Sequence, residues 1–245
     1  MIKFFRNIRH KLLRENRFTR YLIYAVGEII LVVIGILIAL QINNWNEARK
    51  ESMREKKLLS NLNEEFRDNL QDLDSIGTEV NKVIQSLEKV FGLFDQTPEN
   101  VNNDSLDLWL SRALSSPNWK PSDYLLNNLN SSGSITELKN EKLKLLLYKW
   151  ARQHNEMIEV QQRTERTGEE IIAHLKEYGS LRNVDVAGEN FEYPKSRLVV
   201  NNQKLLADPR FENHIDDKLY MYRTTRTWLK RARKTILELI EETKT

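Results

Sequence analysis

The sequence contains no cysteine and few histidines, glycines and prolines: four His, eight Gly and five Pro in 245 residues. Without cysteine, the chain has no disulfide scaffold, no thiol nucleophile and no Cys-based zinc site. The G-x-S-x-G, H-E-x-x-H and P-loop patterns are absent as well. We therefore expect no catalytic residue, no cofactor and no metal site, and we predict that the protein is not an enzyme.

The acid and histidine pairs do not change this expectation. A di-metal site in a helical bundle needs Glu-x-x-His pairs on two helices. Glu170 and His174 are four positions apart rather than three, and the sequence has no second such pair. His214 with Asp217 is most simply a solvated helix face.

The net positive charge is confined to the first 20 residues. They hold seven Lys or Arg and one Glu, a net charge of +6, whereas the whole chain carries +3 and the other 225 residues therefore −3. This distribution is poor evidence for a nucleic-acid-binding surface, and we expect no nucleic acid partner. The apolar residues of this segment recur at helical spacing: Ile2, Phe5, Ile8, Leu12 and Leu13. Residues 1–20 are predicted to form a cytoplasmic amphipathic helix that lies on anionic lipid headgroups.

A long hydrophobic run follows from Tyr21 to Leu40, with Glu28 as its single charge. Twenty helical residues cover about 30 Å, the thickness of the hydrocarbon core. Thirteen Leu, Ile or Val outweigh the roughly 2.5 kcal/mol cost of one acid. We predict an uncleaved transmembrane helix at 21–42, with a cleaved signal peptide as the weaker alternative. Because the basic flank stays in the cytoplasm, residues 43–245 are expected to be exported.

One face of this helix carries small residues and the acid at a 3-4 spacing: Ala25, Glu28, Val32, Gly35 and Ala39. Gly35 and Ala39 form a small-xxx-small pair that lets another helix approach closely, so this face is the predicted membrane helix interface. Three interpretations of Glu28 remain open, namely simple burial against a partner helix, an intersubunit hydrogen bond and a proton relay.

The exported part is predicted to be an all-α, elongated helical bundle. A coiled-coil-like 3-4 seam indicates that the transmembrane helix continues through a long helix at about 43–94: Leu59, Leu62, Phe66, Asn69, Leu73, Ile76, Val80, Val83, Leu87, Val90 and Phe94. Further long helices are expected at about 134–178 and 211–242. Short helices are expected at about 105–114 and 122–130, and the only strand candidate is 197–202.

Helix starts are assigned from capping residues. Asp104 or Ser105 is expected to cap the first short helix and Ser122 the second. Ser134 with Glu137 forms a capping box for the second long helix, whose seam turns polar around Gln161, Thr164 and Gly168 and so is locally weak or encloses polar groups. If the long helices alternate in direction, the loop at 179–210 lies near the membrane and Trp119 at the far tip.

Two features could bind a partner. Trp119 lies between Pro117 and Pro121, where it either closes the bundle or anchors a partner. Four basic residues share one face of the last helix: Arg223, Arg226, Lys230 and Arg233. This face either pairs with acids of the first long helix, such as Asp68, Asp72 or Glu79, or binds an acidic partner or an anionic glycan.

The segment MIKFFRNIRHKLLRENRFTRYLIYAVGEIILVVIGILIALQINNWNE resembles the opening of a family of uncharacterised membrane proteins of Bacteroidota, a domain of unknown function. The segment NSSGSITELKNEKLKLLLYKW resembles the same family less specifically. The resemblance implies the inner membrane of a two-membrane bacterium, with the exported part in the periplasm. It implies no activity, cofactor or catalytic residue.

These observations predict a single-pass inner-membrane protein with a periplasmic helical scaffold. The scaffold is expected to self-associate or to join another membrane protein in a complex. The alternative is a periplasmic ligand-sensing or regulatory module that signals through a partner membrane protein, since only about twenty residues remain for the cytoplasm.

Overall fold

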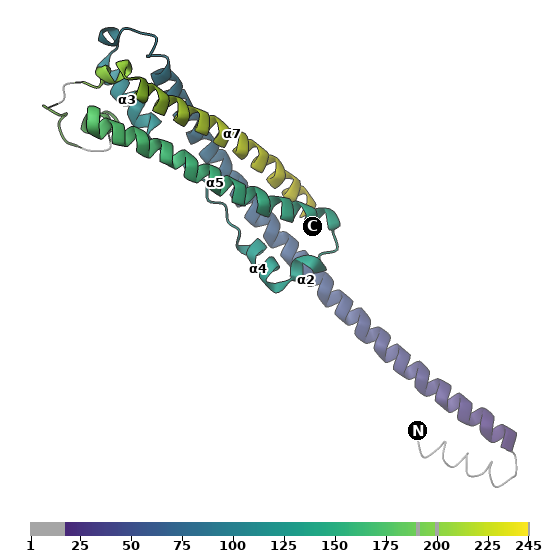
Figure 1. Ribbon diagram of the computed structural model, residues 1–245. Coiled ribbons are helices and arrows are strands. Elements are labelled where there is room, and N and C mark those ends of the chain that lie inside the picture. Colours follow the sequence, from purple (N-terminus) through teal and green to yellow (C-terminus); the bar gives the residue numbers. More distant parts are fainter. Residues whose placement is uncertain (1–17, 190–191, 199–200, 245) are drawn as a thin grey trace. The chain divides into compact units, whose positions relative to one another are not determined.

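The computed structural model describes residues 18–189, 192–198 and 201–244, and these residues form helices and loops without a strand (Figure 1). The α-helices are α2 (Phe18–Phe91), α3 (Asn103–Ala113), α4 (Tyr124–Ser132), α5 (Glu141–Tyr178), α6 (Leu181–Ala187) and α7 (Pro209–Glu242). Three short 3-10 helices are η1 (Pro98–Asn100), η2 (Ser134–Glu137) and η3 (Gln203–Ala207). The all-α fold class is thus confirmed. Most of the predicted amphipathic helix at 1–20, and residues 199 and 200 of the strand candidate, lie outside the described residues.

The chain divides into two compact units, Met1–Leu58 and Leu59–Thr245. In the first unit the described residues all belong to α2, and the large apolar side chains from Leu22 to Met53 are exposed. The second unit has its own core, formed by the rest of α2 together with the other helices.

Within the second unit, α2 buries the predicted seam. Eight of its eleven positions are buried and the other three are half-buried. The helix passes Gly77 and ends at Phe91, three residues before the predicted end, where Gly92 begins a turn.

The predicted alternation of helix directions is wrong. Pairs between α2 and α7 run in opposite order, with Glu88 beside Arg223, Asp74 beside Arg233 and Asn63 beside Ile240. Helices α5 and α7 are also antiparallel, because Glu170 lies by His214, Thr164 by Thr225 and Lys149 by Glu238. Helices α2 and α5 therefore run in the same direction, and α7 returns beside both (Figure 1).

The long connection from 114 to 140 explains this difference. Short connections make neighbouring helices antiparallel, but this segment travels back along the bundle before α5 starts. The Tyr222 hydroxyl donates to the Ser115 carbonyl, and further along the segment Ser122 donates through its backbone N–H to Asn69. The 179–210 loop consequently lies at the end of the unit where α2 stops, shown by the hydrogen bond from Asn202 N to Asn103 Oδ1.

Several predicted helix starts are also corrected. The Ser134 and Glu137 pair forms η2 and does not cap a long helix. Helix α5 starts at Glu141, where Asn140 Oδ1 accepts from Leu143 N at 3.0 Å. The reason is local: the chain leaves α4 through Gly133, with a φ of 73°, and Leu138 turns into extended backbone before α5.

The starts of the other helices also differ from the predictions. Asn102, rather than Asp104 or Ser105, caps α3. Helix α4 begins at Tyr124 because Ser122 is engaged by α2, where its hydroxyl donates to Glu65. Helix α6 was not predicted, and α7 begins two residues early, at Pro209, with Asp208 as its cap.

Candidate functional site

Helix α2 contains an N-terminal segment long and apolar enough to cross a membrane, and no residue in its most apolar window is buried. On the predicted interface, Val32, Gly35 and Ala39 are exposed, while Ala25 and Glu28 are half-buried. A Cβ added at Gly35 would meet nothing within 4 Å. The predicted interface therefore leaves room for an approaching helix.

The basic face of α7 is partly neutralised by α2. Arg233 Nε lies 2.8 Å from Asp74 Oδ1, and an Arg223 Nη lies 2.8 Å from Glu88 Oε1. The predicted pairing with α2 acids thus occurs, but with Asp74 and Glu88 rather than Asp68, Asp72 or Glu79. Among the described residues, Arg226 and Lys230 form no ion pair. Exposed pairs of this kind contribute about 0–1 kcal/mol each.

Trp119 belongs to the core. Its side chain is 2% exposed, and its ring packs edge-on against Trp150 at a centroid distance of 5.9 Å. The Trp119 carbonyl also accepts from Gln161 Nε2 at 3.0 Å. A side chain enclosed in this way presents no surface to a partner, so the interpretation of Trp119 as a partner anchor is wrong.

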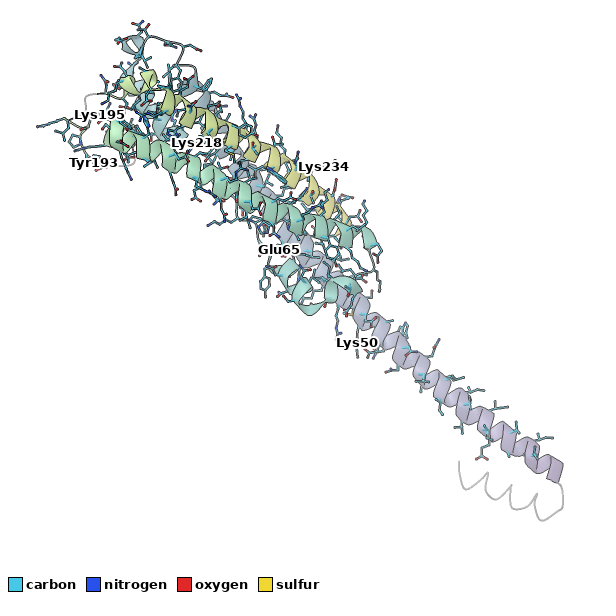
Figure 2. All side chains as sticks on the ribbon, viewed as in Figure 1. Lys50, Glu65, Tyr193, Lys195, Lys218 and Lys234 are labelled. Carbon is cyan, nitrogen blue, oxygen red and sulfur yellow. The ribbon has the colours of Figure 1, made fainter. Side chains whose placement is uncertain are left out.

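A buried lysine on α7 is a candidate functional residue that the sequence did not predict. Lys218 is 0% exposed, and its Nζ has no hydrogen-bond partner among the described residues. Burial lowers its pKa from 10.5 to about 8. Figure 2 labels it on α7 together with Lys234, an exposed lysine of the same helix.

Helix α5 leaves space for this ammonium group because Gly168 has no side chain. A Cβ at Gly168 would lie 2.7 Å from Lys218 Nζ and 3.9 Å from Ser116 Oγ. Lys218 Nζ also lies 5.4 Å from the ring centroid of Tyr222. The close approach requires glycine unless the flexible lysine moves.

A small polar cavity lies between α5, α7 and the segment before α4, and Lys218 is not among its lining residues. It has a volume of about 20 Å³. Its lining residues come from α5, α7 and the segment before α4: Ser116, Pro117, Asn118, Gln161, Thr164, Glu165, Tyr222 and Thr225. The hydroxyls of Thr164 and Thr225 lie 3.0 Å apart. The polar middle of the α5 seam therefore encloses polar groups, which was one of the two predicted readings.

Lys218 could have been found from the spacing. Phe211, Ile215, Lys218, Tyr222 and Thr225 follow a 4-3-4-3 pattern and are all buried. The apolar residues Phe211, Ile215 and Tyr222 indicate this buried face, but the lysine between them does not suggest burial, because lysine is rarely buried without a partner.

A second buried polar group, at the C-terminal end of α5, connects α3 to the loops that follow α5. Asp107 is 0% exposed and accepts from Asn202 Nδ2 at 2.7 Å. Asn202 Oδ1 accepts from Ser180 N at 2.7 Å, and a Cβ at Gly179 would lie 2.8 Å from that oxygen. Burial raises the pKa of Asp107. This cluster satisfies its own polar atoms and so has a structural role.

The histidines at the same end form no metal site. His174 is buried, with Nε2 at 3.3 Å from Asp208 Oδ2, and His214 Nδ1 lies 3.4 Å from Glu170 Oε2. Burial lowers the pKa of His174. Across the described residues, no group of three or more His, Asp or Glu is arranged to hold a metal ion.

Comparison with known proteins gives one family. The sequence pattern of a family of unknown function, DUF6090, matches residues 28–158, more than half of the chain. No curated protein matches the chain, and no solved structure does. The matched region includes α2 from Glu28 onward, α3, α4 and the first half of α5.

Proposed function

The chain belongs to the family of unknown function DUF6090, and we propose that it is a single-pass inner-membrane protein whose helical bundle serves as a scaffold in the periplasm. The scaffold assembles with other copies of itself or with another membrane protein. It carries no catalytic activity. The observation that carries the proposal is the exposed apolar part of α2 in the first unit.

Exposure of this segment has a direct physical consequence. A continuous apolar surface of this size is unfavourable in water and is covered by lipid or by other helices. The backbone groups of the segment are satisfied within the helix, as a lipid environment requires. The basic residues before the segment support an orientation with residues 1–20 in the cytoplasm, on anionic headgroups.

Self-association is supported by the small residues of the stripe. In lipid, helices associate through close packing and hydrogen bonds rather than through the hydrophobic effect. Gly35 and Ala39 permit this close approach, and the Cβ position of Gly35 is open. Arg226 and Lys230 supply a further contact for an acidic surface of the partner.

The test is the oligomeric state of the full chain in mild detergent, measured by crosslinking over a range of concentrations. We expect oligomers that Gly35→Leu weakens. Gly27→Leu is the matched control, because a Cβ there also meets nothing within 4 Å but Gly27 lies outside the stripe. A wild-type chain that stays monomeric at every concentration would refute self-association.

Orientation is tested separately by alkaline phosphatase fused after Thr245. The enzyme folds only after export, so activity supports a periplasmic bundle. An expressed but inactive fusion would overturn the exported assignment.

Ligand sensing is the second candidate function, and the buried polar region around Lys218 is the observation that favours it. A ligand that binds there stabilises the folded bundle by mass action. The signal then reaches a partner helix through the face containing Glu28 and Gly35.

A further inference from the structure

Opposite charges gather on two neighbouring helices of the second unit. Residues 59–80 of α2 contain six Asp or Glu and one Arg, whereas residues 223–234 of α7 contain six Lys or Arg and no acid. The two stretches overlap in level along the bundle, because Asp74 of one pairs with Arg233 of the other. Among the described residues, Arg233 and Arg223 are the members of the basic stretch that form ion pairs.

The surplus charges lie outside the contact between the two helices. An α-helix turns by about 100° per residue, so residues two positions apart lie on opposite sides of it. Asp72 is therefore turned away from the flank of α2 that holds Asp74, and Arg231 is turned away from the flank of α7 that holds Arg233. Four exposed residues of the two stretches form no ion pair with any described residue and carry the argument below: Asp68, Asp72, Arg231 and Lys234.

Trp228 adds an aromatic surface to the same part of α7. Its side chain is half-buried, and Arg231 Cζ lies 5.1 Å from the ring centroid. Trp and Arg are enriched at the centres of protein–protein contacts. This part of α7 therefore combines a positive charge with the residue types of a protein contact.

A second copy of the chain offers the complementary acidic surface at a matching height. Helices α2 and α7 are antiparallel within one chain, so α2 of one copy can lie beside α7 of the next when both copies point the same way. Insertion in one membrane gives the copies this common direction and height. Asp72 is two residues from Asp74, and Lys234 is one residue from Arg233, so their heights differ by about one helical turn or less.

We propose that copies of this protein associate through their bundles, with Asp68 and Asp72 of α2 in one copy facing Arg231 and Lys234 of α7 in the next. The contact is heterologous, because different surfaces of the two copies meet, and it closes into a ring where the rotation between copies allows it. The inference rests on the proposed self-association and assigns to it a surface in the bundle, separate from the small-residue face of the apolar segment.

Proximity is tested first, with two differently tagged copies of the full chain expressed together in membranes. The sequence has no cysteine, so Asp72→Cys in one copy and Lys234→Cys in the other place a single thiol on each surface. A short bismaleimide should then join the two tags. In the control, Lys176→Cys replaces Lys234→Cys, because Lys176 is an exposed lysine at the C-terminal end of α5. Equal crosslinking yields from the two combinations would overturn the proposal.

The second test reverses the charges and measures association of the full chain in mild detergent. Asp72→Lys and Lys234→Glu should each weaken association by about fivefold, the upper range for one exposed ion pair. The double variant D72K/K234E should recover most of the wild-type association, because the new charges attract each other across the contact. Since Asp72 and Lys234 form no ion pair within one chain, such recovery reports a contact between copies. Lys176→Glu should leave association unchanged.

The outcomes separate failure of this contact from failure of self-association. If wild-type oligomers weaken with Gly35→Leu but respond to neither charge reversal, the bundle contact is wrong and self-association stands. If the wild-type chain is monomeric at every concentration, both are wrong. Salt gives a further check, because the screening length falls from about 10 Å at 0.1 M to about 3 Å at 1 M. The Asp72→Cys and Lys234→Cys crosslink should decrease over this range, and a constant yield would contradict a charged contact.

Discussion

Replacing Lys218 by methionine removes a buried ammonium group but keeps a long, unbranched side chain in the same space. We expect this variant to be more stable than wild type at pH 7. A large apolar side chain needs no hydrogen-bond partner in a core, whereas the Lys218 Nζ is left without one.

The magnitude follows from the pKa of the lysine. Burial lowers it from 10.5 to about 8, and one pKa unit corresponds to about 1.4 kcal/mol. The charged lysine therefore costs the folded state roughly 3 kcal/mol below pH 8. Lys218→Met escapes this cost, so its free energy of unfolding at pH 7 should exceed that of wild type by an amount of this order.

The pH dependence has a definite sign. Between about pH 8 and 10.5 the unfolded chain binds the lysine proton and the folded chain does not, so wild-type stability rises with pH across this window. Tyr222 acts in the opposite sense at higher pH, because burial raises its pKa from 10.0 to about 12. Measurements from pH 7 to 10 therefore isolate the lysine.

The assay is urea unfolding of the full chain in detergent at several pH values. The stability difference between Lys218→Met and wild type should shrink as pH rises from 8 to 10, while Lys230→Met, which removes an exposed lysine of the same helix, follows wild type throughout. If Lys218→Met is less stable than wild type at pH 7, or if the difference does not change with pH, the assignment of an uncompensated buried charge is refuted.

Three further predictions concern the bundle. Trp119→Ala should cost about 3–5 kcal/mol of unfolding free energy because the ring is enclosed against Trp150; an effect no larger than that of Trp228→Ala, at a half-buried position, would contradict the core assignment. Since burial lowers the pKa of His174 below 6.5, the folded state holds it neutral, and stability should fall as pH decreases below 6.5; a His174→Gln variant with an unchanged acid limb in urea unfolding would contradict this. Cysteines introduced at positions 63 and 243, whose side chains are in hydrogen-bond contact at 2.9 Å, should form an intramolecular disulfide visible as a gel shift, whereas a pair at 63 and 211 should not, and the reverse result would refute the helix directions.

Local periodicity was sufficient to predict the three long helices, but not α6. The seam of α2 from Leu62 to Val90 is buried as its spacing predicts, because a 3-4 repeat of apolar residues defines one helix face. The starts of α4 and α5 were not predictable, because Ser122 and Ser134 have the composition of caps but are engaged elsewhere. Ser122 is held by Asn69 and Glu65 of α2, and Ser134 Oγ accepts from Ser132 Oγ two residues before it, so neither hydroxyl caps the helix that follows.

Helix direction depends on the length and course of connections rather than on periodicity. The segment from 114 to 140 contains Pro117 and Pro121, which favour extended backbone. A segment of this length can return along a bundle. Helix α5 therefore starts at the end of the second unit where the buried part of α2 also starts. The predicted position of the 179–210 loop was wrong because it assumed that a short connection joins the first two long helices and reverses the chain direction.

The sequence did not predict that the polar stretches of α5 and α7 lie beside each other in the bundle. Helix α5 places Thr164 beside Thr225 and Gly168 beside Lys218 of α7. Gln161 of α5 lines the same small cavity as Thr225. Stability alone favours apolar residues at such positions, since buried charges are costly unless they are paired. The polar groups of the two seams instead contact one another, as the 3.0 Å distance between the Thr164 and Thr225 hydroxyls shows, and Lys218 Nζ is the group that stays without a hydrogen-bond partner among the described residues. The exposed basic face of α7 has no comparable cost to explain, because two of its arginines already pair with α2.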